Sequence, residues 1–289
     1  MAASVACIVG EGIYRLWLTG NLAGERLGPR KTPFGASGEA FLVTSESRPF
    51  YLLSRYGAGK SKTAPSEIND RANMYALKDL GARYVLGWGA GGAIIHNMSI
   101  GEIAILQDLI DRTYLRTKTF FERSPLGYLR QFPVFCPALH GVACEVIHKM
   151  NIPHHDAGIA AVCEGPRLET PAEIRMLAAV GAELVTHAFV PEAFLAKELQ
   201  LCYAALCYVV NYAETGSTHR PFVPGRLFGG LTEDAGADPV ARTIGAVGPI
   251  VAGIAEAVEK APGTCHCDKT MAHNINEYGL PEDWRKWFE

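Results

Sequence analysis

The chain has 289 residues and a mass of 31.3 kDa, with 48% hydrophobic and 20% charged residues. This composition excludes a disordered protein and fits one large folded unit. Lys and Arg number 27 and Asp and Glu number 30, for a net charge of −3, which predicts neither a nucleic-acid nor an anionic-membrane partner. No apolar run approaches the roughly 20 residues that span a bilayer, and we see no signal peptide. We therefore expect a cytoplasmic protein, with its eight cysteines outside any disulfide framework.

Short β-branched segments alternate with helical ones along the chain. Strands are predicted at residues 5–10, 83–87, 103–106, 157–163, 183–187 and 204–211, and helices at 67–80, 171–180, 191–199 and 239–260. Thr170 and Pro171 are typical of a helix start, and Gly181 of a helix end. The alternation predicts one α/β domain with a largely parallel sheet, and the Gly- and Pro-rich segment 216–239 predicts a long loop.

Two glycine-rich turns follow predicted strands. Gly10-Glu11-Gly12 comes after the first strand, where backbone N–H groups often bind anions, although a tight turn also explains these glycines. Residues 87–92 hold four glycines after the second strand. A chain accepts that entropic cost where its backbone packs closely or lines a site. Because ligands bind at the strand ends of α/β sheets, the second turn is the stronger candidate.

The segment 55–62 is basic and contains two glycines, with Arg55, Lys60 and Lys62 as its cations. Such a loop binds a phosphate or carboxylate, or it is simply an exposed, solvated loop, and the sequence leaves both readings open. The glycine spacing of a Walker A motif is absent.

Cys265-His266-Cys267 resembles a metal-binding or redox motif. Zinc needs four ligands at workable spacing, and no second pair is evident in the sequence, so we predict no metal site. A strained disulfide is one alternative, and a reduced pair is what a cytoplasmic setting favours. We assign the neighbouring His154 and His155 to the surface.

The segment 163–173 reads Cys-Glu-Gly-Pro-Arg-Leu-Glu-Thr-Pro-Ala-Glu. It is followed by Val190-Pro191-Glu192 and by a predicted strand that ends in Asn211-Tyr212-Ala213. Further matching segments lie at 32–35, 67–69, 71–73, 110–113, 135–137 and in the Cys-x-Cys tail. In this order, from about residue 5 to about residue 270, these segments resemble the trimeric purine nucleoside phosphorylase and methylthioadenosine phosphorylase family.

The resemblance implies a single domain over residues 1–289, with a C-terminal extension over about 263–289. It further implies a twisted mixed sheet flanked by helices and a homotrimer with sites near the subunit interfaces. The family cleaves the N-glycosidic bond of a purine nucleoside with phosphate as co-substrate, and the resemblance implies no other cofactor.

In that reaction negative charge builds on the departing purine, so a donor near N7 and polar groups at the base edge assist it. By resemblance, Glu164 matches the base-binding glutamate, and Asn211 matches the residue that contacts N7 and the six-substituent. An Asn amide donates to O6 or N7, and a carboxylate accepts from N1–H. We therefore predict that inosine-type compounds outrank adenosine-type ones.

The phosphate end departs from the family pattern at three hydroxyl positions. Glu11 stands where the family's first turn carries Ser or Thr, Gly89 replaces a second hydroxyl, and Ala188 replaces a third. Loss of one charge-assisted hydrogen bond costs about 1.5–3 kcal/mol, and a carboxylate at the first position adds repulsion.

Among the other residues implied for the anion pocket, Ala90 keeps a backbone amide, and Arg55 and Lys60 keep positive charge. Tyr56 replaces a histidine that usually follows the arginine. We predict that these two cations do not restore an ordinary phosphate site, and hence that phosphate dependence is weak or absent.

Three readings follow: an enzyme that acts on purine nucleosides or 5′-modified relatives, an enzyme of the same fold that uses water or another nucleophile, and a binding paralogue without turnover. In the second, Glu11 is a general base and His187 orients the sugar or the nucleophile. The alternatives are an outward-facing Glu11 paired with Arg15 or Arg55, and a packed, hydrogen-bonded His187.

The end of the chain is aromatic, with two Trp and one Phe in residues 284–288. Such side chains need a partner surface, either within the chain or across an interface.

Overall fold

The computed structural model describes residues 3–57, 63–95, 97–156, 158–214, 223–232, 238–260 and 264–288. Its strands are β1 (Val5–Val9), β2 (Gly24–Thr32), β3 (Gly35–Val43), β4 (Phe50–Ser54), β5 (Tyr84–Ala93), β6 (Ile103–Ile105), β7 (Asp108–Arg112), β8 (His154–His155), β9 (Ile159–Cys163), β10 (Leu184–Thr186) and β11 (Cys202–Tyr212). Its α-helices are α1 (Glu11–Leu18), α2 (Asp70–Asp79), α3 (Pro137–Lys149), α4 (Pro171–Ala179), α5 (Glu192–Glu198), α6 (Asp238–Gly245), α7 (Val247–Lys260) and α8 (Ala272–Tyr278). Short 3₁₀ turns lie at Pro65–Glu67, Pro125–Gly127, Cys267–Lys269 and Trp284–Phe288.

The strands form one mixed sheet in the order β2-β3-β4-β1-β5-β10-β9-β7, with β11, β6 and β8 branching from β5. The pairs β1–β4, β1–β5, β5–β11 and β9–β10 are parallel, whereas β5–β10 and the β2–β3–β4 ribbon are antiparallel. The predicted α/β domain with a mixed sheet flanked by helices is therefore confirmed. The prediction of a largely parallel sheet is only partly right, because β2, β3 and β4 pair antiparallel and β10 pairs antiparallel with β5. No strand was predicted at β2, where no position is fully buried, or at β3, whose first half is rich in glycine and small residues.

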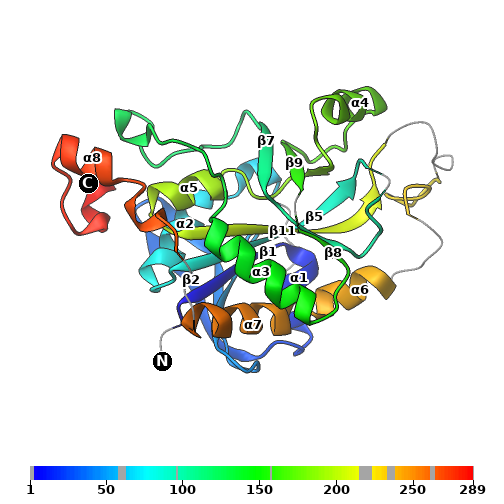
Figure 1. The fold of residues 1–289 in the computed structure, drawn as a ribbon, viewed down its shortest axis with the longest axis horizontal. Coiled ribbons are helices and arrows are strands. Elements are labelled where there is room, and N and C mark those ends of the chain that lie inside the picture. Colours follow the sequence, from blue (N-terminus) through cyan, green and yellow to red (C-terminus); the bar gives the residue numbers. More distant parts are fainter. Residues whose placement is uncertain are drawn as a thin grey trace.

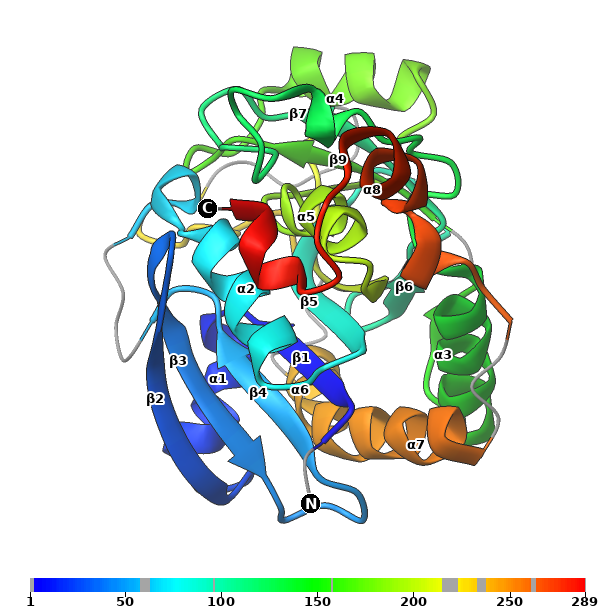
Figure 2. The ribbon, with the colours of Figure 1, turned by 90° about the vertical axis from the view of Figure 1, so that its left-hand side faces the viewer.

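Helices cover both faces of the central strands (Figures 1 and 2). Side chains alternate across β1: Val5 and Cys7 face the helices α1, α3 and α7, whereas Ala6 and Ile8 face α2 and α5. Because both faces are buried, β1 and β4 are apolar at almost every position.

The predicted helix 239–260 is two helices. α6 ends at Gly245 and α7 starts at Val247, with a bend of about 40° between them. Glycine weakens a helix interior, and Pro249 lacks an N–H and fits the first turn of a new helix, so the sequence favours a break here. Among the described residues no single helix is long and apolar enough to cross a bilayer. The bent pair α6 and α7 would meet these criteria of length and composition only if the two helices were counted as one.

The aromatic tail packs on its own chain. Trp284 lies 4.8 Å from Tyr75, and Phe288 lies 5.4 Å from Phe34 and 5.0 Å from Phe120, as distances between ring centroids. Figure 2 shows this segment beside α2. Of the two partner surfaces left open by the sequence, the one within the chain is therefore present.

The sheet divides along one edge of β5. The register of β1 ends opposite Gly87 and that of β10 starts opposite Gly91, while β11 runs beside the whole of β5 on its other edge. The carbonyls of Trp88 and Ala90 in this gap accept side-chain donors, Arg55 Nη1 at 3.0 Å and Thr186 Oγ1 at 2.7 Å. The gap between β1 and β10 therefore brings the side chains of Arg55 and Thr186 to the edge of β5 in the middle of the sheet.

Candidate active site

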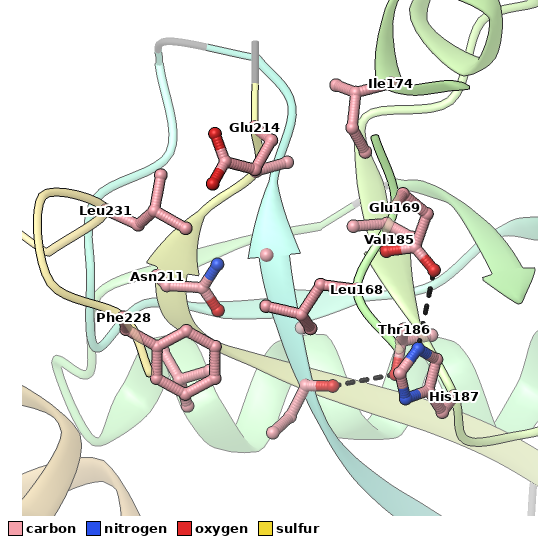
Figure 3. A pocket seen from close by; sticks show the side chains of 15 residues that line it. Leu168, Glu169, Ile174, Val185, Thr186, His187, Asn211, Glu214, Phe228 and Leu231 are labelled. Atoms are coloured by element: carbon pink, nitrogen blue, oxygen red, sulfur yellow. Dashed lines mark hydrogen bonds and ion pairs between the residues drawn. The ribbon is translucent and has the colours of Figure 1, made fainter. Parts of the chain in front are cut away.

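A cavity of about 150 Å³ lies where β5, β10 and β11 meet, next to the division of the sheet. Its polar lining side chains are Glu169, Thr186, His187, Asn211 and Glu214, and its larger apolar ones are Leu168, Ile174, Val185, Val210, Phe228 and Leu231. Figure 3 shows Glu169, Thr186 and His187 on one side and Asn211, Phe228 and Leu231 on the other. The walls are mostly apolar with a few convergent polar groups, which is the usual composition of a small-molecule site.

Asn211 enters the cavity from a β-bulge. The β5–β11 register shifts between Val209 and Asn211, and a bulge at such a position re-aims the side chain. Asn211 is 7% exposed, and its Nδ2 donates to the carbonyl of Tyr212 at 2.7 Å. A Cβ at Gly92 would lie 3.0 Å from that nitrogen, so the glycine makes room for the amide. Among the residues that the structure describes, one N–H and the Oδ1 of Asn211 remain to bind a ligand.

Glu169 and His187 form the opposite wall. His187 Nε2 lies 3.4 Å from Glu169 Oε1, and both side chains are largely buried. Glu169 directly precedes the start of α4, where Thr170 Oγ1 accepts the Glu173 N–H and Glu173 accepts the Thr170 N–H. This capping box confirms the predicted helix start and fixes the loop that carries Glu169.

The thiol of Cys163 lies beside the same carboxylate. Burial and the nearby Glu169 raise the pKa of Cys163 to about 12. At physiological pH the group is therefore a neutral thiol and not the more nucleophilic thiolate.

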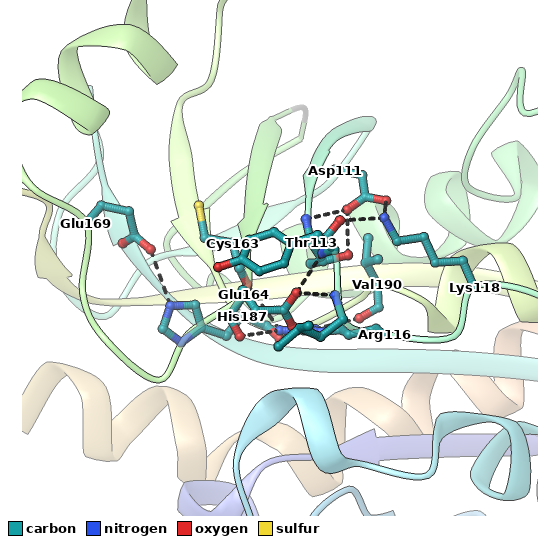
Figure 4. A network of polar contacts seen from close by, with 11 residues as sticks. Asp111, Thr113, Arg116, Lys118, Cys163, Glu164, Glu169, His187 and Val190 are labelled. Carbon is teal, nitrogen blue, oxygen red and sulfur yellow. Dashed lines mark hydrogen bonds and ion pairs between the residues drawn. The ribbon is translucent and has the colours of Figure 1, made fainter.

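Glu164 lies outside this cavity, in the polar network of Figure 4. Its carboxylate accepts the N–H groups of Tyr114 at 2.6 Å and Leu115 at 2.9 Å, and it pairs with Arg116 Nε at 3.0 Å. Burial disfavours the charged carboxylate, but these donors outweigh burial and lower the pKa of Glu164. Within the described residues the Glu164 carboxylate is thus engaged by three donors of its own chain, whereas resemblance implies a base-binding role for it.

Arg116 joins this network to the cavity wall. Its guanidinium donates to the carbonyls of His187 at 2.8 Å, Val190 at 2.6 Å and Cys163 at 3.1 Å. The Arg116–Glu164 pair therefore ties the loops after β7, β9 and β10 together, and it holds the backbone at His187.

The residues predicted for the anion pocket meet at the division of the sheet. A Cβ at Gly89 would lie 2.6 Å from Ala188 Cβ, so these two positions touch, and Arg55 bonds to the adjacent Trp88 carbonyl. Ala90 lines the neighbouring cavity. Lys60 lies outside the described residues.

Arg55 is already paired. It is 5% exposed, and Glu192 accepts from its Nε at 2.5 Å and from its Nη2 at 3.1 Å. Burial disfavours the charged guanidinium, but Glu192 outweighs burial and raises the pKa of Arg55. The cation predicted for an anion pocket is thus neutralised by a carboxylate of the same chain.

Glu11 is paired on its own helix and does not line the cavity. Its carboxylate lies 3.1 Å from Arg15 Nη2, one helical turn along α1, and its side chain is 42% exposed. This is the outward-facing arrangement that the sequence left open as an alternative to a general base.

Glu169, Thr186, Glu214 and Arg116 were not singled out from the sequence. Glu169 stands in the segment 163–173, which holds three glutamates, and the sequence prediction gave the base-binding role to the first of them, Glu164. Arg116 carries no local signal, because its partner Glu164 is 48 residues away in the sequence.

The chain matches the phosphorylase superfamily over residues 28–225. It is 37% identical over 211 residues to a probable 6-oxopurine nucleoside phosphorylase of Moorella thermoacetica, covering 72% of this chain and 79% of that protein. It is 32% identical over 212 residues to an S-methyl-5′-thioadenosine phosphorylase of Saccharolobus solfataricus, covering 73% and 77%. A crystal structure of a methylthioadenosine phosphorylase from an antarctic soil metagenomic library matches with a TM-score of 0.81 at 23% identity, covering 94% of this chain and 92% of that one.

Proposed function

The chain belongs to the phosphorylase superfamily, and from this membership we propose that it cleaves the N-glycosidic bond of purine nucleosides that carry a 6-oxo base. The observation that carries the proposal is the cavity with the Asn211 amide on one side and the Glu169 carboxylate on the other. Its relatives named as 6-oxopurine nucleoside phosphorylases support the same substrate class.

The base is recognised by complementary hydrogen bonds. A 6-oxopurine presents acceptors at O6 and N7 and a donor at N1–H. The free N–H of Asn211 donates to the acceptor edge, and Glu169 accepts from N1–H, the task that resemblance had given to Glu164. Leu168 and Phe228 supply apolar contacts for the ring. The Asn211 bond strengthens as charge gathers on the leaving purine, so it favours the transition state over bound substrate.

The sugar lies nearer to β10 in this proposal. His187 is held by Glu169 on its side chain and by Arg116 on its carbonyl, so its imidazole is fixed to hydrogen-bond a sugar hydroxyl. Thr186 Oγ1 donates to the Ala90 carbonyl at 2.7 Å and accepts the Ala188 N–H at 3.3 Å, which leaves one lone pair to accept from the substrate.

A second candidate for the nucleophile is water. The pairing of Arg55 with Glu192 and the absence of hydroxyls at Gly89 and Ala188 support it over phosphate. In that hydrolysis the water oxygen bonds to C1′, the C1′–N9 bond breaks with its electron pair on the purine, and the water proton is transferred to the departing base.

The proposal for the assembly rests on the family resemblance, and the proposal for the location rests on the sequence analysis. We propose a homotrimer in the cytoplasm. Light scattering at micromolar concentration tests the first, and a stable monomer would contradict it. Cell fractionation tests the second.

The experiment that tests the function is a nucleoside panel with and without phosphate. Inosine, guanosine, adenosine and their 5′-methylthio relatives are incubated with the protein, and free base, free sugar and sugar 1-phosphate are separated by chromatography. Hypoxanthine or guanine release is expected, and the sugar product identifies the nucleophile. Binding of these nucleosides without any base release would instead support the non-catalytic paralogue.

A further inference from the structure

Four cysteines from distant parts of the sequence converge on one point. Their Sγ atoms, from Cys136, Cys202, Cys265 and Cys267, all lie within 4.8 Å of one another. Cys202 Sγ is 3.5 Å from Cys265 Sγ, and all four are free thiols. The sequence showed only the Cys265–Cys267 pair, because the other two join it only through the fold.

The three supporting segments are firmly placed. Cys136 is the N-cap of α3 and Cys202 opens β11, and they are 3% and 4% exposed. Cys265 and Cys267 lie at the start of the C-terminal extension, and Thr270 Oγ1 of the same segment donates to the Lys197 carbonyl at 2.6 Å. Two ligands therefore belong to the core and two to the extension.

The spacing fits a tetrahedral ion. Zinc binds thiolates at about 2.3 Å, which separates the sulfurs of a tetrahedral site by about 3.8 Å. The four sulfurs lie within 4.8 Å of one another, so no separation exceeds the tetrahedral one by more than about 1 Å. A disulfide, in contrast, needs a sulfur pair at about 2.05 Å, which the 3.5 Å contact is not.

The surroundings suit the charge of such a site. One Zn²⁺ with four thiolates carries a net charge of −2, and the adjoining cavity of about 470 Å³ carries Arg130, Lys197 and Lys269 on its wall. Among the described residues that line it, none is acidic. The N–H of Leu139 donates to Cys136 Sγ at 3.5 Å, and the N-terminus of α3 favours negative charge there.

We propose that Cys136, Cys202, Cys265 and Cys267 bind one Zn²⁺ in a structural tetrathiolate site that fastens the C-terminal extension to the core. On binding, four thiols lose their protons and no electrons are transferred. The site has no open position for a substrate. It stands at the first residue of β11, about 30 Å along that strand from Asn211, so it stabilises the fold and takes no part in cleavage. This proposal replaces the expectation from sequence of no metal.

Metal content is the first measurement. The full chain is expressed without a polyhistidine tag, purified in reductant without chelator, and analysed for metals. About one zinc per chain is expected. Cys267→Ser should lower that content severalfold, whereas Cys144→Ser, a partly buried cysteine outside the cluster, should keep it. Exchange of zinc for Co²⁺ in the wild-type chain should give the visible absorption of tetrahedral cobalt thiolate.

Measurements of the thiol state and of the thermal stability give the outcomes that would overturn the proposal. Alkylation of the denatured wild-type chain without reductant should modify all eight cysteines, and a strong chelator should lower its melting temperature. Protection of the four cluster cysteines as disulfides would overturn the proposal. Four free thiols that take up neither zinc nor cobalt would overturn it equally. Because the chelator test uses the wild-type chain, it remains decisive even where a variant fails to fold.

Discussion

The guanidinium of Arg55 and the carboxylate of Glu192 form a buried two-point ion pair, with distances of 2.5 Å and 3.1 Å between their nitrogen and oxygen atoms. Tyr203 Oη donates to the same carboxylate at 2.6 Å. A phosphate that approached Arg55 would compete with Glu192 for the guanidinium and would be repelled by it. Of the two cations predicted for the anion pocket, Arg55 is the one within the described residues. Its pairing with Glu192 therefore leaves it unavailable to an anion at the division of the sheet.

We predict a weak phosphate response. The three missing hydroxyls, at Glu11, Gly89 and Ala188, each withdraw about 1.5–3 kcal/mol from a bound phosphate. For that reason, raising phosphate from zero to about 50 mM should increase base release less than about threefold. The titration is followed by chromatography of free base, with sulfate at equal ionic strength as the control. A saturable rise of several tens of fold would show that the chain binds phosphate in another way.

Substitution of Glu164 should affect folding more than base recognition. Glu164→Gln leaves Arg116 buried without its partner charge, which costs about 3–5 kcal/mol and lowers the melting temperature by on the order of 10 °C. The ratio of kcat/KM for inosine to that for adenosine should stay within about twofold of wild type, because Glu164 does not line the cavity.

Glu169→Gln should show the opposite pattern to Glu164→Gln, with a loss of activity and little loss of stability. It should lower kcat/KM for inosine by about 10- to 100-fold, since an amide accepts N1–H less well and presents a competing donor. Its melting temperature should change by less than about 2 °C, because the amide oxygen can keep the contact with His187 Nε2 and no buried arginine loses its partner charge. Calorimetry and steady-state kinetics on both variants decide the matter, and an exchange of the two patterns would return the base-binding role to Glu164.

Features that depend on neighbouring residues could be predicted from the sequence, whereas contacts between residues far apart in the sequence could not. Thr170 and Pro171 begin a helix because a hydroxyl cap and a ring without N–H act within one turn. Glu164 could not be separated from Glu169 in the same way, since the choice depends on Arg116, which only the fold brings near. The four-cysteine cluster has the same origin, because β11 and α3 must form before Cys202 and Cys136 meet the tail.

Burial of Glu198 should make stability depend on pH. Glu198 is 3% exposed, and it accepts from Thr119 Oγ1 at 2.5 Å and from the Phe120 N–H at 2.7 Å. Burial outweighs these bonds and raises the pKa of Glu198 to about 7. The native state therefore holds this proton more tightly than the unfolded state, so wild-type stability falls as pH rises from about 4.3 to about 7.

Glu198→Gln removes that titration. The melting temperature of the variant minus that of the wild type should rise as pH increases from about 5 to about 8, whatever its value at the lower pH. Glu145→Gln, an exposed substitution on α3, should leave the difference flat. A difference that is independent of pH in Glu198→Gln would mean that Glu198 keeps an ordinary pKa in the folded protein.

The identity of residue 211 should set the preference between 6-oxo and 6-amino bases. The Asn211 amide donates to O6, whereas a 6-amino group is itself a donor and faces it as a mismatch. A mismatched buried polar pair costs about 1–3 kcal/mol, so inosine should exceed adenosine in kcat/KM by about 10- to 100-fold. Asn211→Asp offers a carboxylate acceptor to the amino group and should reverse the order.

The same substitution at Asn151 is the control. Asn151 is exposed and has a positive φ of 52°, a conformation that Asp also tolerates, so Asn151→Asp adds the same charge without touching the cavity. It should leave the inosine-to-adenosine ratio unchanged. The ratio also separates recognition from stability, since a partly unfolded variant loses activity toward both nucleosides alike. An adenosine preference in the wild type that persists in Asn211→Asp would mean that the six-position is recognised elsewhere in the cavity, with Glu214 as the next side chain to test.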